Sequence, residues 1–216
     1  MRNKLIFHEI ANYELNEKFF HLLSLVSKDR QQKISNFKLD IDKKLSLYAE
    51  IIVRKYISQK IHLENFEIEF EENKYGKPYL KGYPDFFFNI SHTHNAIVVA
   101  LSNELVGVDV EKIKTADLAI AKRFFSDKEI KYIHSAQFDQ DKRFYEIWTR
   151  KEAYIKHVGK GLSIPLKSFD VQDELLKKRI KTFYQDEYVI SVCSSQAYEN
   201  IKWEYEIYDE KTIFTY

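Results

Sequence analysis

The sequence contains few of the residues that cross-link, break or bend a chain. Its 216 residues include one cysteine, three prolines and five glycines. A single cysteine excludes an intrachain disulfide, and the strand-like run around Cys193 predicts a small buried thiol. No stretch approaches the roughly 20 apolar residues of a membrane span. Residues 1–12 lack the apolar run of a signal peptide. We therefore expect a cytoplasmic protein that does not bind a membrane.

An excess of either charge is also missing. The 34 lysines and arginines balance 33 aspartates and glutamates, for a net charge of +1, which argues against a protein that binds nucleic acid through bulk positive charge. The composition, 44% hydrophobic and 15% aromatic, is typical of a globular protein of one large or two small domains. Nine lysines and arginines gather between residues 28 and 60. Most are expected on solvated helix faces, but a local anion site can form there.

Two short segments carry most of the chemical information. The first is GVDVE at 107–111. Side chains alternate along a strand, so the valines share one face, which needs a core, while Gly107, Asp109 and Glu111 share the other. Two carboxylates roughly 7 Å apart can reach one oxygen-seeking cation such as Mg²⁺. The ordinary alternative is an amphipathic strand with a solvated acidic face.

The second segment is WTRKEAYIK at 148–156, within a helix predicted over 140–158 and ended by Gly159. Residues four apart stack on one helix face, so Trp148, Glu152 and Lys156 form a column. In an isolated helix, Glu152 and Lys156 would be an ordinary surface pair worth about 0.3 kcal/mol. Next to the acidic strand, they could instead help to hold a divalent cation against a phosphate.

Both segments resemble the signatures of the Sfp-type 4′-phosphopantetheinyl transferases, a G-[IV]-D-[IV]-E strand followed by a W-[ST]-x-K-E-[AS]-x-x-K helix. Supporting motifs follow the family's order: GKP at 76–78, FNISH at 88–92, IAKRFFS at 120–126 and GKGLSIPL at 159–166. The resemblance spans most of the chain, although the tail after about Phe169 carries no such motif.

The resemblance implies a reaction and a set of site residues. The family transfers 4′-phosphopantetheine from coenzyme A to a serine hydroxyl of an apo acyl or peptidyl carrier protein and releases adenosine 3′,5′-bisphosphate. The implied Mg²⁺ ligands are Asp109, Glu111 and Glu152. Glu152 could also take the proton of the serine, directly or through water. The implied catalytic residues are Glu152, Lys156 and His92. The residues implied to bind coenzyme A are Arg30, Lys33, Ser46, Lys77, Pro78, Ser91, His92 and Lys156.

Three of these assignments concern a loosely patterned region. The resemblance places Arg30 and Lys33 against the 3′-phosphate and Ser46 at a phosphate-contacting hydroxyl. Arg30 stands where a lysine is common, but arginine can bind phosphate through two nitrogens. His92 and His94 are expected on one strand face, yet no third ligand nearby favours a transition-metal site.

The resemblance implies an α+β fold of two similar halves related by a pseudo-twofold axis, with the active site in the cleft between them. We divide the chain into residues 1–105, the nucleotide-binding side, and residues 106–216, the metal and catalytic side. The length is typical of the family's monomeric branch. Helices are expected over 16–36, 40–59 (capped by Asp40), 116–125, from a capping box at 126–129, and 140–158. Strands are expected near 5–7, 68–70, 86–89, 96–101, 105–111, 169–171, 181–183, 188–193 and 202–208, with a hairpin turn at Asn103.

Two other functions fit parts of the sequence. A D-x-E strand followed by an E-x-x-x-K helix would suit a Mg²⁺-dependent nuclease, but the balanced charge argues against one. A non-catalytic protein that binds carrier domains or coenzyme A is the second alternative. The presence of all the expected metal carboxylates argues against it.

Overall fold

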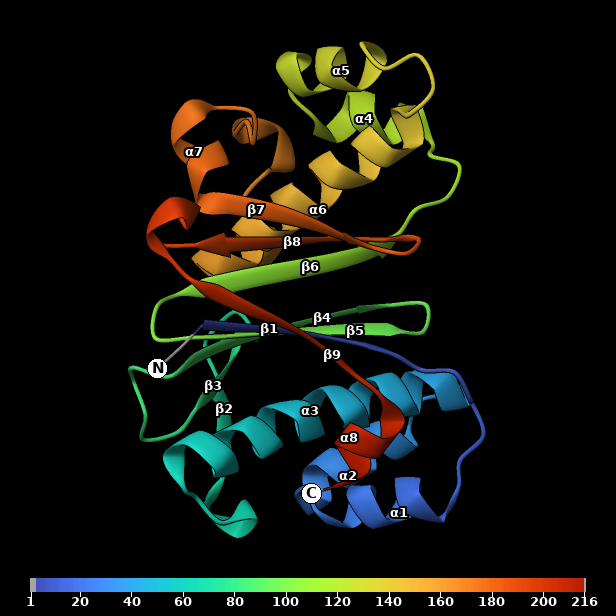
Figure 1. Ribbon diagram of the computed structural model, residues 1–216, viewed down its shortest axis with the longest axis vertical. Helices are drawn as coiled ribbons and strands as arrows, with labels where there is room; N and C mark the ends of the chain where they lie inside the picture. Colours follow the sequence, from blue (N-terminus) through green and yellow to red (C-terminus); the bar gives the residue numbers. More distant parts are fainter. Residues whose placement is uncertain (1–2, 216) are drawn as a thin grey trace.

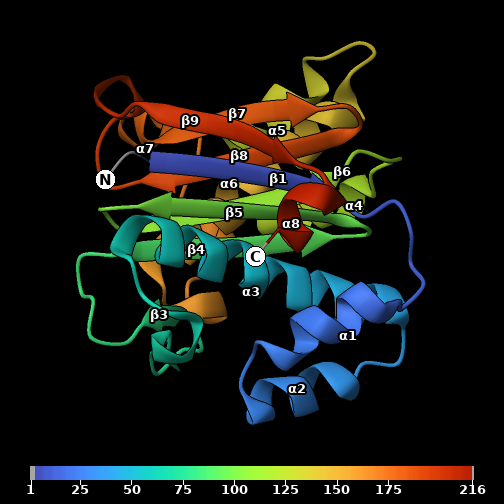
Figure 2. The same cartoon turned by 60° about the horizontal axis from the view of Figure 1, so that its bottom comes forward.

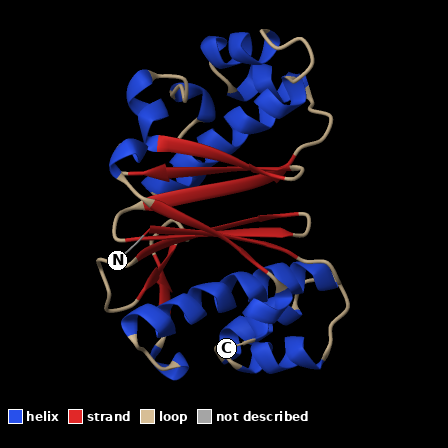
Figure 3. Cartoon of the chain, viewed as in Figure 1, coloured by secondary structure: helices blue, strands red, loops and turns tan. Residues whose placement is uncertain are grey.

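The computed structural model describes residues 3–215 and arranges them in four layers (Figure 1). Two β-sheets lie face to face in the middle, and helices cover the two outer faces (Figure 3). The sheet orders are β4-β5-β1-β9 and β6-β8-β7, with β2 and β3 as a separate pair. The strands are β1 Asn3–Glu9, β2 Phe70–Glu72, β3 Pro78–Leu80, β4 Phe87–Thr93, β5 Ala96–Ser102, β6 Val106–Lys112, β7 Ile180–Gln185, β8 Tyr188–Ser194 and β9 Trp203–Tyr208. The helices are α1 Glu17–Ser24, α2 Lys28–Ser35, α3 Asp40–Ile61, α4 Leu118–Phe124, α5 Asp127–His134, α6 Gln140–Val158, α7 Glu174–Arg179 and α8 Glu210–Phe214.

The two halves of the chain repeat one topology. In the first half, β1 is followed by helices ending in the long α3 and then by β4 and β5. In the second half, β6 is followed by helices ending in the long α6 and then by β7 and β8. The sheets correspond strand for strand, as β4-β5-β1 and β7-β8-β6, and each central strand is antiparallel to both neighbours. The predicted α+β fold of two similar halves is confirmed.

The centre of the molecule is an apolar layer between the two sheets. All seven residues of β5 are buried, because one face of the strand packs toward α3 and the other toward the second sheet. The valines of β6 close this layer from the opposite side, as the sequence predicted. The other face of β6, which carries the carboxylates, therefore turns toward α6.

The predicted hairpin at Asn103 is wrong. β5 pairs with β1 and β4, whereas β6 pairs with β8, so the turn carries the chain from one sheet to the other. The apolar faces of β5 and β6 meet across the layer instead of sharing a ladder. The hairpin in this region joins β4 to β5 through His94, whose φ of 47° is left-handed, and Asn95. His94 thus lies beyond the end of β4 and does not share a strand face with His92.

The predicted helix over 16–36 is divided in two. α1 ends at Ser24, and α2 begins at Lys28 because the Ser27 hydroxyl accepts a bond from the Arg30 amide. α3 begins at Asp40, so Leu39 holds the capping position that was predicted for Asp40. The Asp40 carboxylate pairs with Lys43 instead, at 2.8 Å.

Other expectations for the second half have mixed outcomes. No strand forms at 169–171, where the Val171 amide instead donates to the Glu129 carboxylate. The bounds of α6 are those predicted, and Gly159 ends the helix with a φ of 70°. Cys193 is the predicted buried thiol, and burial raises its pKa to about 12.

The C-terminal segment returns to the first half. β9 pairs in parallel with β1, from Asn3 opposite Trp203 to His8 opposite Tyr208. α8 then packs against α3, where Figure 2 shows it next to that helix. The division at 105/106 falls between β5 and β6, but residues 203–214 lie with the first half. No helix among residues 3–215 has the length and apolar character needed to cross a bilayer.

Candidate active site

The predicted site residues of the two halves meet where β4 faces β6. Alternate polar residues of β4 point toward β6, because side chains two apart share a strand face. The Asn89 amide oxygen accepts from the Val108 amide at 2.8 Å. Ser91 donates to the Asp109 carboxylate at 2.7 Å, and the Thr93 hydroxyl donates to Glu111 at 2.9 Å. The FNISH and GVDVE motifs are therefore two sides of one polar seam.

Lys156 completes this seam from α6. Its ammonium donates to Asp109 Oδ1 at 2.7 Å and to the Ser91 hydroxyl at 2.8 Å. Asp109 is 5% exposed, and the Lys156 side chain retains 28% exposure. The lysine is thus fixed at one end of a strand-to-helix contact, with part of its surface open to a ligand.

Gly107 allows α6 to lie directly on β6. A Cβ atom at this position would be 2.1 Å from the Ala153 carbonyl oxygen and 2.2 Å from the His157 amide nitrogen. The absence of a side chain at Gly107 thus permits a close approach by helix backbone. His157 is also buried at this contact. Burial lowers its pKa to about 4, with a further contribution from the charge of Arg179.

The three carboxylates predicted to bind Mg²⁺ affect one another's ionisation, although Lys156 pairs with Asp109. Burial raises the pKa of both Glu111 and Glu152, and the charge of Asp109 raises each of them further. Asp109 Oδ2 is buried and has no hydrogen-bond partner among the described residues. Carboxylate oxygens in such surroundings fit a divalent cation.

These carboxylates are not gathered into a ready-made metal site. Among residues 3–215, no group of three or more acidic, histidine or cysteine side chains is arranged to hold a metal ion. Lys156 and Ser91 occupy one oxygen of Asp109 instead. Mg²⁺ usually binds through one or two carboxylates together with waters and substrate phosphates, so an incomplete protein site is compatible with it. The metal assignment stays a prediction.

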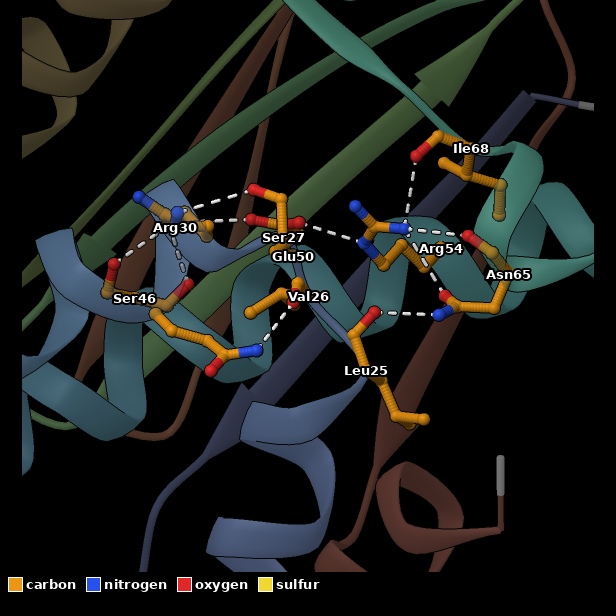
Figure 4. Close-up of polar contacts among 10 residues, drawn as sticks. Leu25, Val26, Ser27, Arg30, Ser46, Glu50, Arg54, Asn65 and Ile68 are labelled. Carbon is orange, nitrogen blue, oxygen red and sulfur yellow. Dashed lines mark hydrogen bonds and ion pairs between the residues drawn. The ribbon is translucent and has the colours of Figure 1, made fainter.

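The first half contributes a hollow whose lining carries both charges, with Arg30, Lys33 and Arg54 beside Asp29, Glu50 and Glu72. Arg30 of α2 lines this hollow and is joined to Ser46 of α3, because the guanidinium donates to the Ser46 hydroxyl at 2.8 Å and to its carbonyl oxygen at 3.0 Å (Figure 4). Lys33 lies one turn after Arg30, is exposed and lines the same hollow of about 340 Å³. The structure thus brings together the three residues that were predicted to bind a phosphate.

A second hollow continues from this one toward the catalytic helix. It measures about 240 Å³ and is lined by Gly76, Lys77, Lys156 and others. Both hollows share Pro78 and Ile90 among their lining residues, so they adjoin, and we call the pair the groove. A larger hollow of about 620 Å³ beside Lys4, Tyr56 and Phe86 contains none of the predicted site residues. We place the site by its chemistry and not by volume.

Lys77 occupies a position that its sequence motif did not indicate. Its ammonium donates to the carbonyl oxygens of Val106 and Lys156, at 2.9 and 2.6 Å, and burial lowers its pKa to about 8. Asn73 adds a bond to the carbonyl of Gly159. Lys77 thus ties the first half to the end of the catalytic helix. Its contact with coenzyme A stays a prediction.

His92 lies within electrostatic reach of both Lys156 and Arg30. Its imidazole is exposed, yet crowding by surrounding protein atoms lowers its pKa, and the charges of Lys156 and Arg30 lower it further. The predicted phosphate contacts of His92 are compatible with this place between the two cationic groups.

Sequence reasoning missed three residues of the site. Thr93 could have been found from the alternation of Asn89, Ser91 and Thr93 along the FNISHT strand. Glu50 and Arg54 are buried at the edge of the first hollow. Two opposite charges four residues apart within the apolar run of α3 were the available signal.

Comparisons with known proteins agree with this geometry. Residues 14–104 match the family model "4′-phosphopantetheinyl transferase, N-terminal", and residues 105–207 match that of the "4′-phosphopantetheinyl transferase superfamily". The 4′-phosphopantetheinyl transferase gsp of Aneurinibacillus migulanus is 38% identical over 205 residues, which cover 88% of this chain and 85% of that protein.

Two further relatives have related names. The 4′-phosphopantetheinyl transferase Sfp of Bacillus subtilis (strain 168) is 39% identical, over 74% of this chain and 70% of its own. The L-aminoadipate-semialdehyde dehydrogenase-phosphopantetheinyl transferase of Homo sapiens is 29% identical, over 74% and 57%. These matches favour a transferase over a nuclease or a non-catalytic binding protein. The chain therefore belongs to the 4′-phosphopantetheinyl transferases, the enzymes that transfer phosphopantetheine from coenzyme A to carrier proteins.

Proposed function

We propose that this transfer depends on Mg²⁺ held by Asp109, Glu111 and Glu152, and that it modifies a serine of an apo acyl or peptidyl carrier protein. The enzyme acts as a cytoplasmic monomer that binds neither nucleic acid nor a membrane. One observation carries the proposal. The groove is lined by Arg30 and Lys33 in the first hollow and by Lys156 in the second, and the Lys156 ammonium donates to Asp109 Oδ1 at 2.7 Å.

The residues of the groove divide the work by their charge. Phosphoryl transfer depends mainly on positioning and charge neutralisation. Arg30, Lys33 and Ser46 hold the 3′-phosphate end of coenzyme A, while Lys156 and His92 contact the phosphates nearer the reacting bond. Glu152 accepts the proton of the carrier serine, directly or through water. When bound, Mg²⁺ supplies a Lewis acid that neutralises charge on the pyrophosphate.

The proposal predicts a metal-dependent change in carrier mass. With coenzyme A and Mg²⁺, an apo carrier protein should gain the mass of one phosphopantetheinyl group, measured by mass spectrometry of the intact protein. Chelation with EDTA should stop the gain, and added Mg²⁺ should restore it. A carrier with alanine at the acceptor serine serves as the control. A gain that persists in EDTA would contradict the metal assignment and leave the transferase activity standing.

The double change Arg30→Ala/Lys33→Ala should weaken the use of coenzyme A but hardly affect 3′-dephospho-coenzyme A, which lacks the 3′-phosphate. A charge-assisted contact is worth about 1.5–3 kcal/mol, so kcat/KM for coenzyme A should fall at least tenfold. Steady-state rates with both donors measure this. Lys43→Ala is the matched control, because it removes a nearby charge that pairs with Asp40. If kcat/KM falls by the same factor with both donors, then Arg30 and Lys33 do not bind the 3′-phosphate.

A further inference from the structure

A buried acid lies where an anion is proposed to bind. Glu50 of α3 is 8% exposed and lines the first hollow with Arg30 and Lys33. By charge alone, a carboxylate in this place should repel a phosphate. Its presence therefore calls for a role other than contact with the ligand.

Both oxygens of Glu50 are used by arginines. Oε2 accepts from Arg30 Nε at 2.7 Å, and Oε1 accepts from Arg54 Nε at 2.8 Å (Figure 4). Arg30 also donates through Nη2 to Ser46. Nη1 of Arg30 has no partner among the described residues, and the side chain is 31% exposed. Two of its three nitrogens are thus fixed by protein, which leaves the third for a ligand.

The contacts continue beyond Glu50 and return to the start of α2. Arg54 Nη1 donates to the carbonyl oxygens of Asn65 and Ile68, at 3.1 and 3.2 Å. The Asn65 side chain in turn donates to the Leu25 carbonyl at 2.7 Å. Leu25 lies two residues before Ser27, the cap of α2. Figure 4 shows these groups in one continuous chain of polar contacts.

α2 depends on this chain because it has little apolar anchoring. The helix has eight residues, of which Ile34 is buried, and it carries both residues proposed to bind the 3′-phosphate. Fixing a flexible arginine costs side-chain entropy. A guanidinium already held in place loses less of this freedom when a ligand binds, so preorganisation raises affinity.

We propose that Glu50 is a positioning residue for the 3′-phosphate of coenzyme A. It orients Arg30 and, through Arg54 and Asn65, anchors α2. The preorganisation that it provides outweighs the repulsion of its charge. This inference rests on the proposed function, in which Arg30 contacts that phosphate.

The test is Glu50→Gln, with KM and kcat measured for coenzyme A and 3′-dephospho-coenzyme A. The amide keeps the size of the side chain but cannot accept from both arginines. KM for coenzyme A should rise about tenfold, the effect of losing one charge-assisted contact. The value of kcat and both constants for the dephospho donor should stay near wild type. Glu69→Gln, an exposed acid paired with Lys81, is the matched control.

Two further variants make the result specific. In an Arg30→Ala background, Glu50→Gln should raise KM for coenzyme A by a smaller factor than in the wild type, because the part of its role that runs through Arg30 is already lost. Asn65→Ala, at the far end of the chain of contacts, should raise KM for coenzyme A alone and by a smaller factor. It provides the readout if Glu50→Gln fails to fold.

Each contrary result overturns the proposal. A lower or unchanged KM for coenzyme A with Glu50→Gln would show that repulsion equals or outweighs positioning. Equal losses on both donors, together with a lower melting temperature, would make Glu50 a residue of folding only. If Arg30→Ala itself fails to distinguish the donors, the phosphate assignment of the proposed function is wrong and the role of Glu50 falls with it. Failure confined to Glu50→Gln leaves that assignment intact.

Discussion

Replacing Gly107 with alanine is expected to destabilise the fold by about 3 kcal/mol or more and to inactivate the enzyme. The added methyl carbon would lie 2.1 Å from the Ala153 carbonyl oxygen and 2.2 Å from the His157 amide nitrogen. Both are backbone atoms of α6, so no side-chain rotation can relieve the overlap. β6 and α6 must separate, and the contact between Lys156 and Asp109 separates with them.

Denaturant unfolding and transfer activity together measure this effect. The control is Gly82→Ala, whose added methyl meets no atom within 4 Å but whose φ is +79°. Gly82→Ala should lower the free energy of unfolding by about 1–2 kcal/mol, the cost of placing a residue with a Cβ atom in the left-handed conformation. Its transfer activity should be retained. If the free energy of unfolding of Gly107→Ala lies within about 1 kcal/mol of the wild-type value and the variant is fully active, then α6 does not pack against Gly107 as closely as described.

Glu152→Gln should slow transfer by roughly 10²–10³-fold while the protein stays folded. The proposed role gives Glu152 a metal contact and the proton of the serine, and losing one charge-assisted group in a transition state typically costs about 2–4 kcal/mol. The side chain is partly exposed, and its pKa is raised by burial and by Asp109. Removal of its charge should therefore not lower the melting temperature.

Single-turnover rates at saturating Mg²⁺ test this without interference from substrate or product binding. Asp139→Asn is the matched control at the other end of α6, where the Asp139 side chain makes no capping bond. A rate for Glu152→Gln within about threefold of wild type would show that Glu152 is neither a metal ligand nor the proton acceptor, because loss of a catalytic carboxylate slows a reaction much more than that.

The sequence predicted those strands and helices in which the spacing of apolar residues reflects which face is buried. The valines of β6 face the apolar layer between the sheets, and α6 has its predicted bounds because its apolar positions and Gly159 define it locally. The partner of β6 was not predictable in this way. The same alternation of side chains suits a hairpin with β5 or a separate sheet packed on it, and the choice depends on contacts with β8, more than 70 residues away along the chain.

The candidate site shows the same division between local and distant information. The motifs named Asp109, Glu152 and Lys156, and the structure places the ammonium of Lys156 on Asp109. The two bonds of Lys77 to backbone carbonyls could not be predicted, because backbone groups leave no signature in side-chain identity. The same is true of the carbonyls of Asn65 and Ile68 that hold Arg54.

The return of β9 to the first sheet has a consequence for synthesis on the ribosome. The strand that pairs with one edge of β1 leaves the exit tunnel about 200 residues after β1 itself, since Asn3 pairs with Trp203. Until Trp203–Tyr208 emerge, that edge of β1 keeps unpaired backbone groups, which are prone to pair with other chains. The sheet of the first half is thus completed only after β9 has emerged, and a chaperone that covers this edge of β1 would protect the nascent enzyme until then.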